Sequence, residues 1–157
     1  MQKVRIMALG GLDEDGKNMY VIEIDEDIFV IEAGIKYPES AQLGVEYIIP
    51  DFTYLKENSK RIKGIFITHG HDDVMSALPF LLKEIDLDIY ATALTAKYIE
   101  PYIDSRKRVK IIKMIKIDIL ILALMILLLN QIKVLNGLQV ELFQEVLQQM
   151  ILLVLEK

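Results

Sequence analysis

The chain has 157 residues, 53% of them hydrophobic, which is enough for one domain with a core. It contains no cysteine, which excludes a disulfide framework and a thiolate metal site, and we expect a reducing, cytoplasmic location. The net charge of −5 argues against indiscriminate electrostatic binding of nucleic acid, and the early charges in Met1–Ile6 argue against a secretory signal.

The first third of the chain predicts three strands. Lys3–Leu9 predicts a strand that ends at two glycines, followed by a polar loop over 12–18 whose three acids we expect to be solvated. Met19–Ile24 and Ile28–Ala33 predict a β-hairpin with an acidic turn between them. Both runs are apolar at nearly every position, which indicates a sheet covered on both faces.

Glu32 interrupts the second apolar run of the hairpin. Its carboxylate is either a buried acceptor that braces a neighbouring loop or an exposed strand end, and the composition does not decide between the two. Residues 33–52 carry several glycine and proline breakers and predict irregular structure. A short helix is predicted over Tyr54–Asn58, and the cluster Lys60-Arg61-Ile62-Lys63 predicts a solvated edge, with RNA contact as the less favoured alternative.

The next segment contains the only two histidines of the chain, His69 and His71. They follow a predicted buried strand, Gly64–Ile67, and precede Asp72 and Asp73. Imidazole nitrogens and carboxylate oxygens in a turn after a strand can converge on one divalent ion, and a glycine between the histidines permits the tight bend. The alternative is a pair of loop histidines with solvated acids.

After the histidines the pattern alternates between helix and strand. Ser76 is a candidate N-cap for a helix reaching Ile85, with Pro79 in its first turn. A strand over Leu87–Ala91 and a helix over Leu94–Ile103 follow. The alternation predicts an α/β fold with helices layered on a sheet.

The segment Thr68-His69-Gly70-His71-Asp72-Asp73-Val74 resembles the His-x-His-x-Asp-His signature of metallo-β-lactamase-fold hydrolases. The flanking sequence is more specifically similar to ribonuclease J, over roughly residues 4–103. The matching segments are Ala8-Leu9-Gly10-Gly11, Gly16-Lys17-Asn18-Met19-Tyr20, Glu32-Ala33-Gly34-Ile35-Lys36-Tyr37-Pro38-Glu39, Leu43-Gly44-Val45, Ile49-Pro50-Asp51 and Ala77-Leu78-Pro79-Phe80-Leu81-Leu82.

The chain departs from the family signature at two positions. Val74 stands where the signature has its last histidine, and Glu32 stands where the family has aspartate. Because the family has an acid at position 32, the resemblance favours the buried acceptor for Glu32. These departures resemble the degenerate second paralogue of ribonuclease J, which is weakly active or inactive alone and works with an active paralogue. The resemblance therefore leaves open whether this chain is itself an enzyme.

The family resemblance implies a metal-dependent exo- and endoribonuclease of rRNA processing and mRNA decay, in which two divalent ions clamp a phosphodiester. It implies that His69 and His71 are ligands of the first ion, zinc or manganese. Asp73 would be a ligand of the second ion and would orient the attacking water, which makes it the catalytic candidate. Asp72 holds a variable position and is expected to be solvated. With Val74 in place of a ligand, we expect metal binding to be weak or absent.

The sequence changes character after residue 104. The net charge is −9 over 1–104 and +4 over 105–157, and all four prolines and seven of the eight glycines precede residue 105. We therefore predict a partial metallo-β-lactamase-like domain over 1–104 and an apolar, helical tail over 105–157 that arises from a frameshift or truncation. A genuine helical extension is the alternative. Ile119–Leu129 is apolar but too short to span a membrane.

Three functions are compatible with these features. The first is a ribonuclease J-type RNA-processing protein, degenerate or truncated, and we favour it. The second is a non-catalytic module that binds an active ribonuclease J, and the third is another hydrolase of the same fold. The expected partners are RNA and an active paralogue, with no membrane and no DNA.

Overall fold

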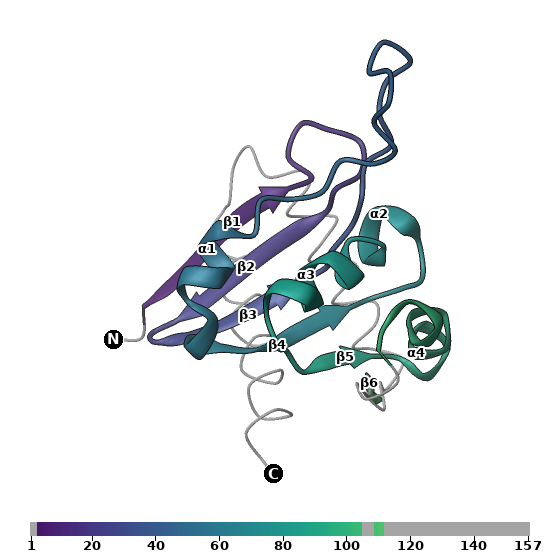
Figure 1. Cartoon of the computed structure of the whole chain (residues 1–157). Coiled ribbons are helices and arrows are strands. Elements are labelled where there is room, and N and C mark those ends of the chain that lie inside the picture. The colour runs from purple at the N-terminus through teal and green to yellow at the C-terminus, as the bar shows by residue number, and fades with distance from the viewer. Residues whose placement is uncertain (1–2, 105–108, 112–157) are drawn as a thin grey trace, which may run out of the picture. The chain divides into compact units, whose positions relative to one another are not determined.

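The computed structural model describes residues 3–104 and 109–111. The described residues form one mixed sheet in which the strands neighbour each other in sequence order (Figure 1). The first three strands are antiparallel, whereas each later strand runs parallel to the one before it. The strands are β1 (Val4–Gly10), β2 (Met19–Ile24), β3 (Asp27–Ile31), β4 (Ile62–Ile67), β5 (Ile89–Ala91) and β6 (Val109–Ile111).

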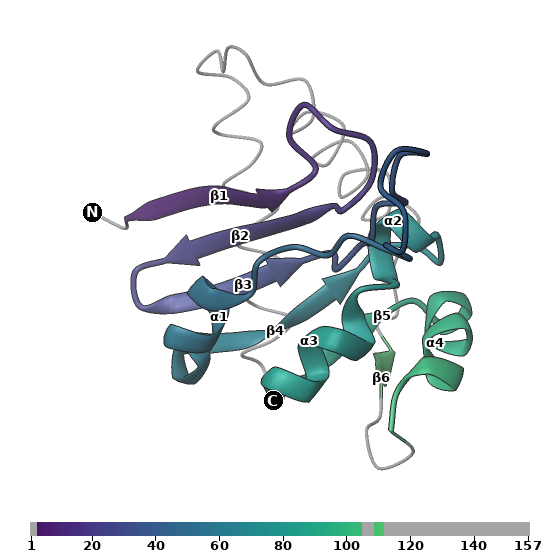
Figure 2. The ribbon, with the colours of Figure 1, turned by 45° about the horizontal axis from the view of Figure 1, so that its top comes forward.

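Short helices connect the parallel strands. They are α1 (Thr53–Glu57), α2 (Asp72–Met75), α3 (Leu78–Glu84) and α4 (Ala93–Ile99), with 3-10 turns at η1 (Ser59–Arg61) and η2 (Glu100–Tyr102). Helices α1 and α3 lie on the same face of the sheet, and α4 lies beside β5 and β6 (Figure 2). No described helix is long and apolar enough to cross a membrane.

The core lies between the sheet and helices α1 and α3. Val21, Val30 and Ile65 of the sheet belong to the same buried cluster as Leu55 of α1 and Leu81 of α3. Burying each such side chain contributes about 1.5 to 3 kcal/mol. Every residue of β2 is buried, including Glu23, which agrees with the prediction from a run that is apolar at nearly every position.

The predicted α/β layering and the hairpin are confirmed. Strands β2 and β3 pair from Tyr20 opposite Ile31 to Ile24 opposite Asp27. The strand predicted at Lys3–Leu9, the helix at Tyr54–Asn58 and the strand at Leu87–Ala91 correspond to β1, α1 and β5 within a few residues at each end.

The helix predicted from Ser76 is wrong at its start. Helix α2 already begins at Asp72, and Ser76 ends it, because the Ser76 hydroxyl donates to Asp72 Oδ1 at 2.8 Å and does not cap a following helix. Helix α3 then begins at Leu78, with Pro79 in its first turn as predicted. Likewise, the helix predicted over Leu94–Ile103 ends at Ile99, where a 3-10 turn containing Pro101 follows.

Two further expectations need correction. Glu14 is not simply solvated, because its carboxylate pairs with Lys17 at 3.1 Å and Lys36 at 3.5 Å and accepts from the amide of Gly11. Of the tail predicted to be helical, residues 109–111 form strand β6, parallel to β5. The rest of that prediction falls outside the described residues, and the domain boundary at residue 104 stays a prediction.

Candidate functional site

The two histidines lie in the loop that joins β4 to α2, at the carboxyl end of a parallel strand. The edge of the sheet at the carboxyl ends of its parallel strands is where open α/β sheets place their ligand sites. The bend at Gly70 brings His69 and His71 to the same side of the loop, where their rings meet edge to face with centroids 4.6 Å apart.

The backbone of 33–35 holds this loop in place. The amide of Ala33 donates to the carbonyl of Val74 at 2.7 Å, and the amide of Ile35 donates to that of Asp72 at 3.0 Å. Gly34 sits between these two bonds, and a Cβ built there would lie 1.6 Å from the Asp73 carbonyl oxygen. Only glycine allows the two backbone segments to approach this closely.

The side chains of Glu32, Thr68, His69 and His71 form a hydrogen-bonded chain in which Glu32 Oε1 is the acceptor, with the carboxyl proton of Glu32 on Oε2 when it is bound. The Thr68 hydroxyl donates to Glu32 Oε1 at 2.6 Å, so it accepts from His69 Nδ1 at 2.8 Å. The Nε2 atom of His69 then carries the lone pair and lies 3.1 Å from Nδ1 of His71. In the absence of a cation, Nδ1 of His71 donates a hydrogen bond to this lone pair. In this arrangement His69 is the Nδ1–H tautomer.

Glu32 begins this chain from an unusual position. Its side chain is buried, its backbone is left-handed with φ of 66°, and its Oε2 atom has no hydrogen-bond partner. Burial raises the pKa of Glu32 to about 8, with a smaller increase from the Asp73 charge, against the opposing hydrogen bonds of Thr68. The expectation of a buried acceptor bracing the loop is confirmed for Oε1, whereas Oε2 is unsatisfied.

The electrostatic surroundings favour a neutral His69. Burial lowers the pKa of His69 and the neighbouring His71 lowers it further, while Asp73 acts in the opposite direction. A neutral imidazole with a free Nε2 lone pair is the form that binds a metal ion.

The two aspartates have separate partners. Asp73 is half-buried, and Asn18 donates through Nδ2 both to its carbonyl oxygen at 3.0 Å and to Oδ2 at 3.1 Å. Asp72 is exposed, as expected, but it also accepts from the Tyr37 hydroxyl at 2.7 Å and from Ser76. Hydrogen bonds from Tyr37 and Ser76 lower the pKa of Asp72.

Sequence inspection did not predict the partners Asn18, Thr68 and Tyr37, although Asn18 lies in a segment that resembles the family.

Val74, which stands where the family signature has its last histidine, has its side chain in the core. Val74 is 4% exposed and belongs to the main apolar cluster. It therefore contributes packing to α2 where the family signature contributes a ligand.

The histidine pair fits one edge of a metal coordination shell. Two nitrogens at about 2.05 Å from a tetrahedral zinc ion are about 3.3 Å apart, and His69 Nε2 and His71 Nδ1 are 3.1 Å apart. Within the described residues, no group of three or more His, Asp or Glu side chains is arranged to hold a metal ion, so Asp73 does not complete the shell. The residues fit a two-nitrogen site.

The metallo-beta-lactamase superfamily model matches residues 12–146. The chain belongs to this superfamily. Similar proteins include ribonuclease J2 of Bacillus subtilis, 51% identical over 94 residues that make up 60% of this chain and 17% of that protein. Ribonuclease J 2 of Streptococcus pyogenes is 41% identical over 110 residues, 70% of this chain and 20% of that protein. The expected similarity to ribonuclease J is thus confirmed, and the chain spans about a fifth of the length of these curated relatives.

A solved structure of the short form of human tRNase Z gives a TM-score of 0.37 and 18% identity, covering 69% of this chain and 44% of that chain. Superfamily membership implies use of a divalent metal. In the described part of this superfamily member, the histidine loop is a place where two imidazole nitrogens face each other.

Proposed function

We propose that this chain belongs to a ribonuclease J-type RNA-processing protein of the cytoplasm, with a divalent cation bound at the histidine loop. The observation that carries the proposal is the separation of 3.1 Å between His69 Nε2 and His71 Nδ1, in a chain similar to ribonuclease J2. RNA is the substrate class that the names of the relatives suggest.

His69 and His71 would hold the cation, zinc or manganese, which when bound supplies an activated water for attack on a phosphodiester. Thr68 holds the His69 ring through Nδ1, which would leave Nε2 to bind the cation. Asp73 is the residue proposed to orient the water, and Asn18 fixes its carboxylate through Oδ2.

We infer that cation binding is weak and that this chain alone has little or no nuclease activity. A two-metal mechanism needs ligands for a second ion, and the side chain at position 74 is a buried valine. The described residues supply no third ligand beside the two nitrogens, and such a two-nitrogen site exchanges its ion readily.

Calorimetric titration of the full chain with zinc, and separately with manganese, tests the metal site. We expect measurable but weak binding that His71→Ala abolishes, and equal binding by both proteins would refute the site. Incubation with 5′-monophosphorylated RNA and either metal tests the activity. Robust removal of 5′ nucleotides that disappears in His71→Ala would overturn the inferred impairment.

A second candidate function is a non-catalytic partner of an active ribonuclease J. The burial of Val74 favours it, because the loop is retained while one ligand position serves the core. Co-purification with an active ribonuclease J that His69→Ala leaves unchanged would support this role, and the absence of co-purification would refute it.

A further inference from the structure

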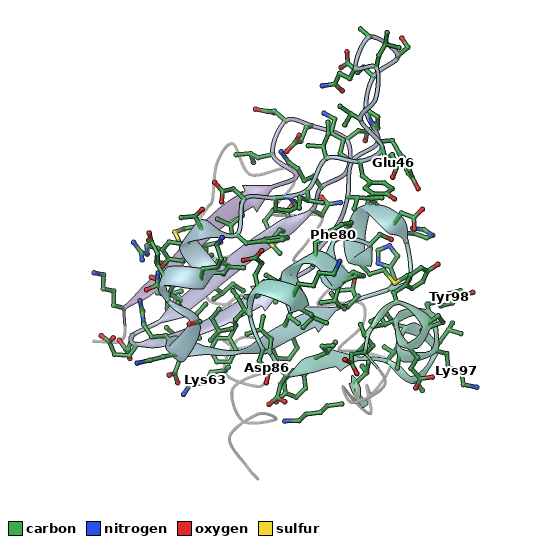
Figure 3. The ribbon with its side chains drawn as sticks, viewed as in Figure 1. Glu46, Lys63, Phe80, Asp86, Lys97 and Tyr98 are labelled. Atoms are coloured by element: carbon green, nitrogen blue, oxygen red, sulfur yellow. The ribbon has the colours of Figure 1, made fainter. Side chains whose placement is uncertain are left out.

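Strand β1 forms one border of the described sheet. Its inner edge pairs with β2, and in the described part of the chain no strand lies along its outer edge (Figure 2). Helix α4, with Lys97 and Tyr98, lies at the opposite border, beside β5 and β6 (Figure 3). An uncovered strand edge is a template for pairing with another strand.

The backbone groups that face outward from β1 belong to alternate residues. The carbonyl of Lys3 accepts from the amide of Asp25 at 2.9 Å, so Lys3 directs its backbone groups toward β2. Because the direction alternates along an antiparallel ladder, every second residue after Lys3 does the same, and the residues between them direct their N–H and C=O groups outward. The outward residues are Val4, Ile6 and Ala8.

Strand β1 lacks the features that usually protect an edge strand from pairing. It is seven residues long and contains no proline. Its one charged residue, Arg5, donates to Glu23 Oε2 at 2.6 Å and to the Tyr54 hydroxyl at 2.9 Å, which holds the guanidinium over the sheet. Strand β6, at the other described border, is only three residues long. The long edge is therefore the one left open to a partner strand.

The charges at the two ends of β1 favour a second copy of this chain as that partner. Lys3 is exposed at the start of the strand, and Asp13 and Asp15 are exposed in the loop that follows its end. When two copies of β1 run antiparallel, the basic start of each lies near the acidic exit of the other, and a two-fold axis makes this contact twice. A parallel arrangement would bring like charges together.

One register of this antiparallel pair suits the strand best. With Ile6 opposite the partner's Ile6, Val4 lies opposite the partner's Ala8. Arg5 then faces the partner's Met7, which is apolar. A shift in one direction places the two Arg5 side chains opposite each other, which is unfavourable. A shift in the other direction requires pairing beyond Ala8, where the ladder with β2 is already irregular.

We propose that two copies of this chain associate through β1, forming a continuous antiparallel sheet across a two-fold axis at Ile6. The outward N–H and C=O groups of Ile6 in the two copies bond to each other in this arrangement. The interface uses no residue of the histidine loop and does not depend on the proposed function.

The absence of cysteine from the chain allows the register to be tested with single cysteines. Ile6→Cys should form a disulfide-linked dimer under a mild oxidant, because directly opposite residues of an antiparallel pair lie within disulfide range. Ala8→Cys is the matched control, since Ala8 is more exposed on the same edge but would lie about 14 Å from its copy along the pair. A mixture of Val4→Cys and Ala8→Cys should cross-link, whereas neither variant should do so alone.

Sedimentation velocity of the full chain measures the association itself. Ile6→Pro removes the outward amide from both copies and spares the bonds to β2, so the dimer dissociation constant should rise about 5- to 150-fold. A dimer that Ile6→Pro leaves unchanged, or equal cross-linking of Ile6→Cys and Ala8→Cys, would overturn the interface. If circular dichroism shows that Ile6→Pro is not folded, the cysteine variants decide.

A partner of another kind would give a different result. If the wild-type chain is monomeric at every soluble concentration, self-association through β1 is overturned. If that monomer binds an active ribonuclease J and Ile6→Pro does not, the edge belongs to that protein and the second copy is again excluded.

Discussion

Glu32→Gln should remove a pH dependence of stability that the buried carboxyl imposes. Burial raises the folded-state pKa of Glu32 to about 8 from 4.5, so the folded protein holds this proton over a range in which the unfolded chain has released it. Stability contributed by the proton is therefore present below about pH 4.5 and declines as the pH rises to about 8. Between pH 5 and pH 8.5 the free energy of unfolding should fall by about 4 kcal/mol from this group alone. That is a large part of the stability of a small domain.

Urea denaturation of the full chain, with EDTA present, at pH 5 and pH 8.5 measures this effect. The pKa of His69 is lowered, so its contribution to the free energy of unfolding rises with pH below about pH 6.5, opposite to that of Glu32. The quantity to compare between the two pH values is therefore the difference in free energy of unfolding between wild type and Glu32→Gln. The variant should gain stability relative to wild type as the pH rises. A difference between the two proteins that is the same at both pH values would show that Glu32 does not bind a proton in this range, which would refute the reasoning.

Glu23→Gln is the matched control, because Glu23 is also a buried glutamate of the sheet region. Burial would raise the pKa of Glu23, but hydrogen bonds from Tyr54 and Arg5 outweigh it and the pKa is lowered. Its contribution to stability is present above about pH 4.5 and is lost only as the pH falls further. Glu23→Gln should therefore change stability by the same amount at pH 5 and pH 8.5.

Three further substitutions test how the loop is held. Gly34→Ala should lower stability by more than about 3 kcal/mol, measured by thermal unfolding, because its Cβ would overlap the Asp73 carbonyl; a melting temperature near wild type would contradict the close approach. Asn18→Ala should cost about 1 to 3 kcal/mol in urea denaturation through the lost bonds to Asp73, and no change would show that water replaces them. Thr68→Val should weaken zinc binding by about 10- to 100-fold in calorimetry, because His69 loses the contact that orients its ring; unchanged affinity would contradict that role.

The elements of this fold were predictable where the signal is local. Strand β2 and the hairpin follow from runs that are apolar at nearly every position on either side of an acidic turn, and the sheet buries both. The histidine loop was predictable because it combines the only two histidines with a glycine at the end of an apolar strand. Those signals each lie within about ten residues.

The contacts that complete the site were not predictable, because they join residues distant in sequence. Asn18 reaches Asp73 across 55 positions, and Thr68 reaches Glu32 across 36. The resemblance makes Asp73 a candidate ligand of a second ion, whereas the hydrogen bond of its carboxylate to Asn18 is a contact that the sequence did not indicate. The start of α2 was missed for a related reason, since Ser76 has the composition of an N-cap but bonds backwards to Asp72.

The histidine loop is held by contacts that involve no metal ion. Backbone bonds from Ala33 and Ile35 fix its far side, and the Thr68 hydroxyl ties its start to Glu32. Loss of a ligand at position 74 therefore need not disorganise the loop, because Val74 adds apolar packing to the same support. The loop therefore keeps its conformation through contacts that a bound cation would not supply: backbone bonds from Ala33 and Ile35, the Thr68 hydroxyl and the packing of Val74.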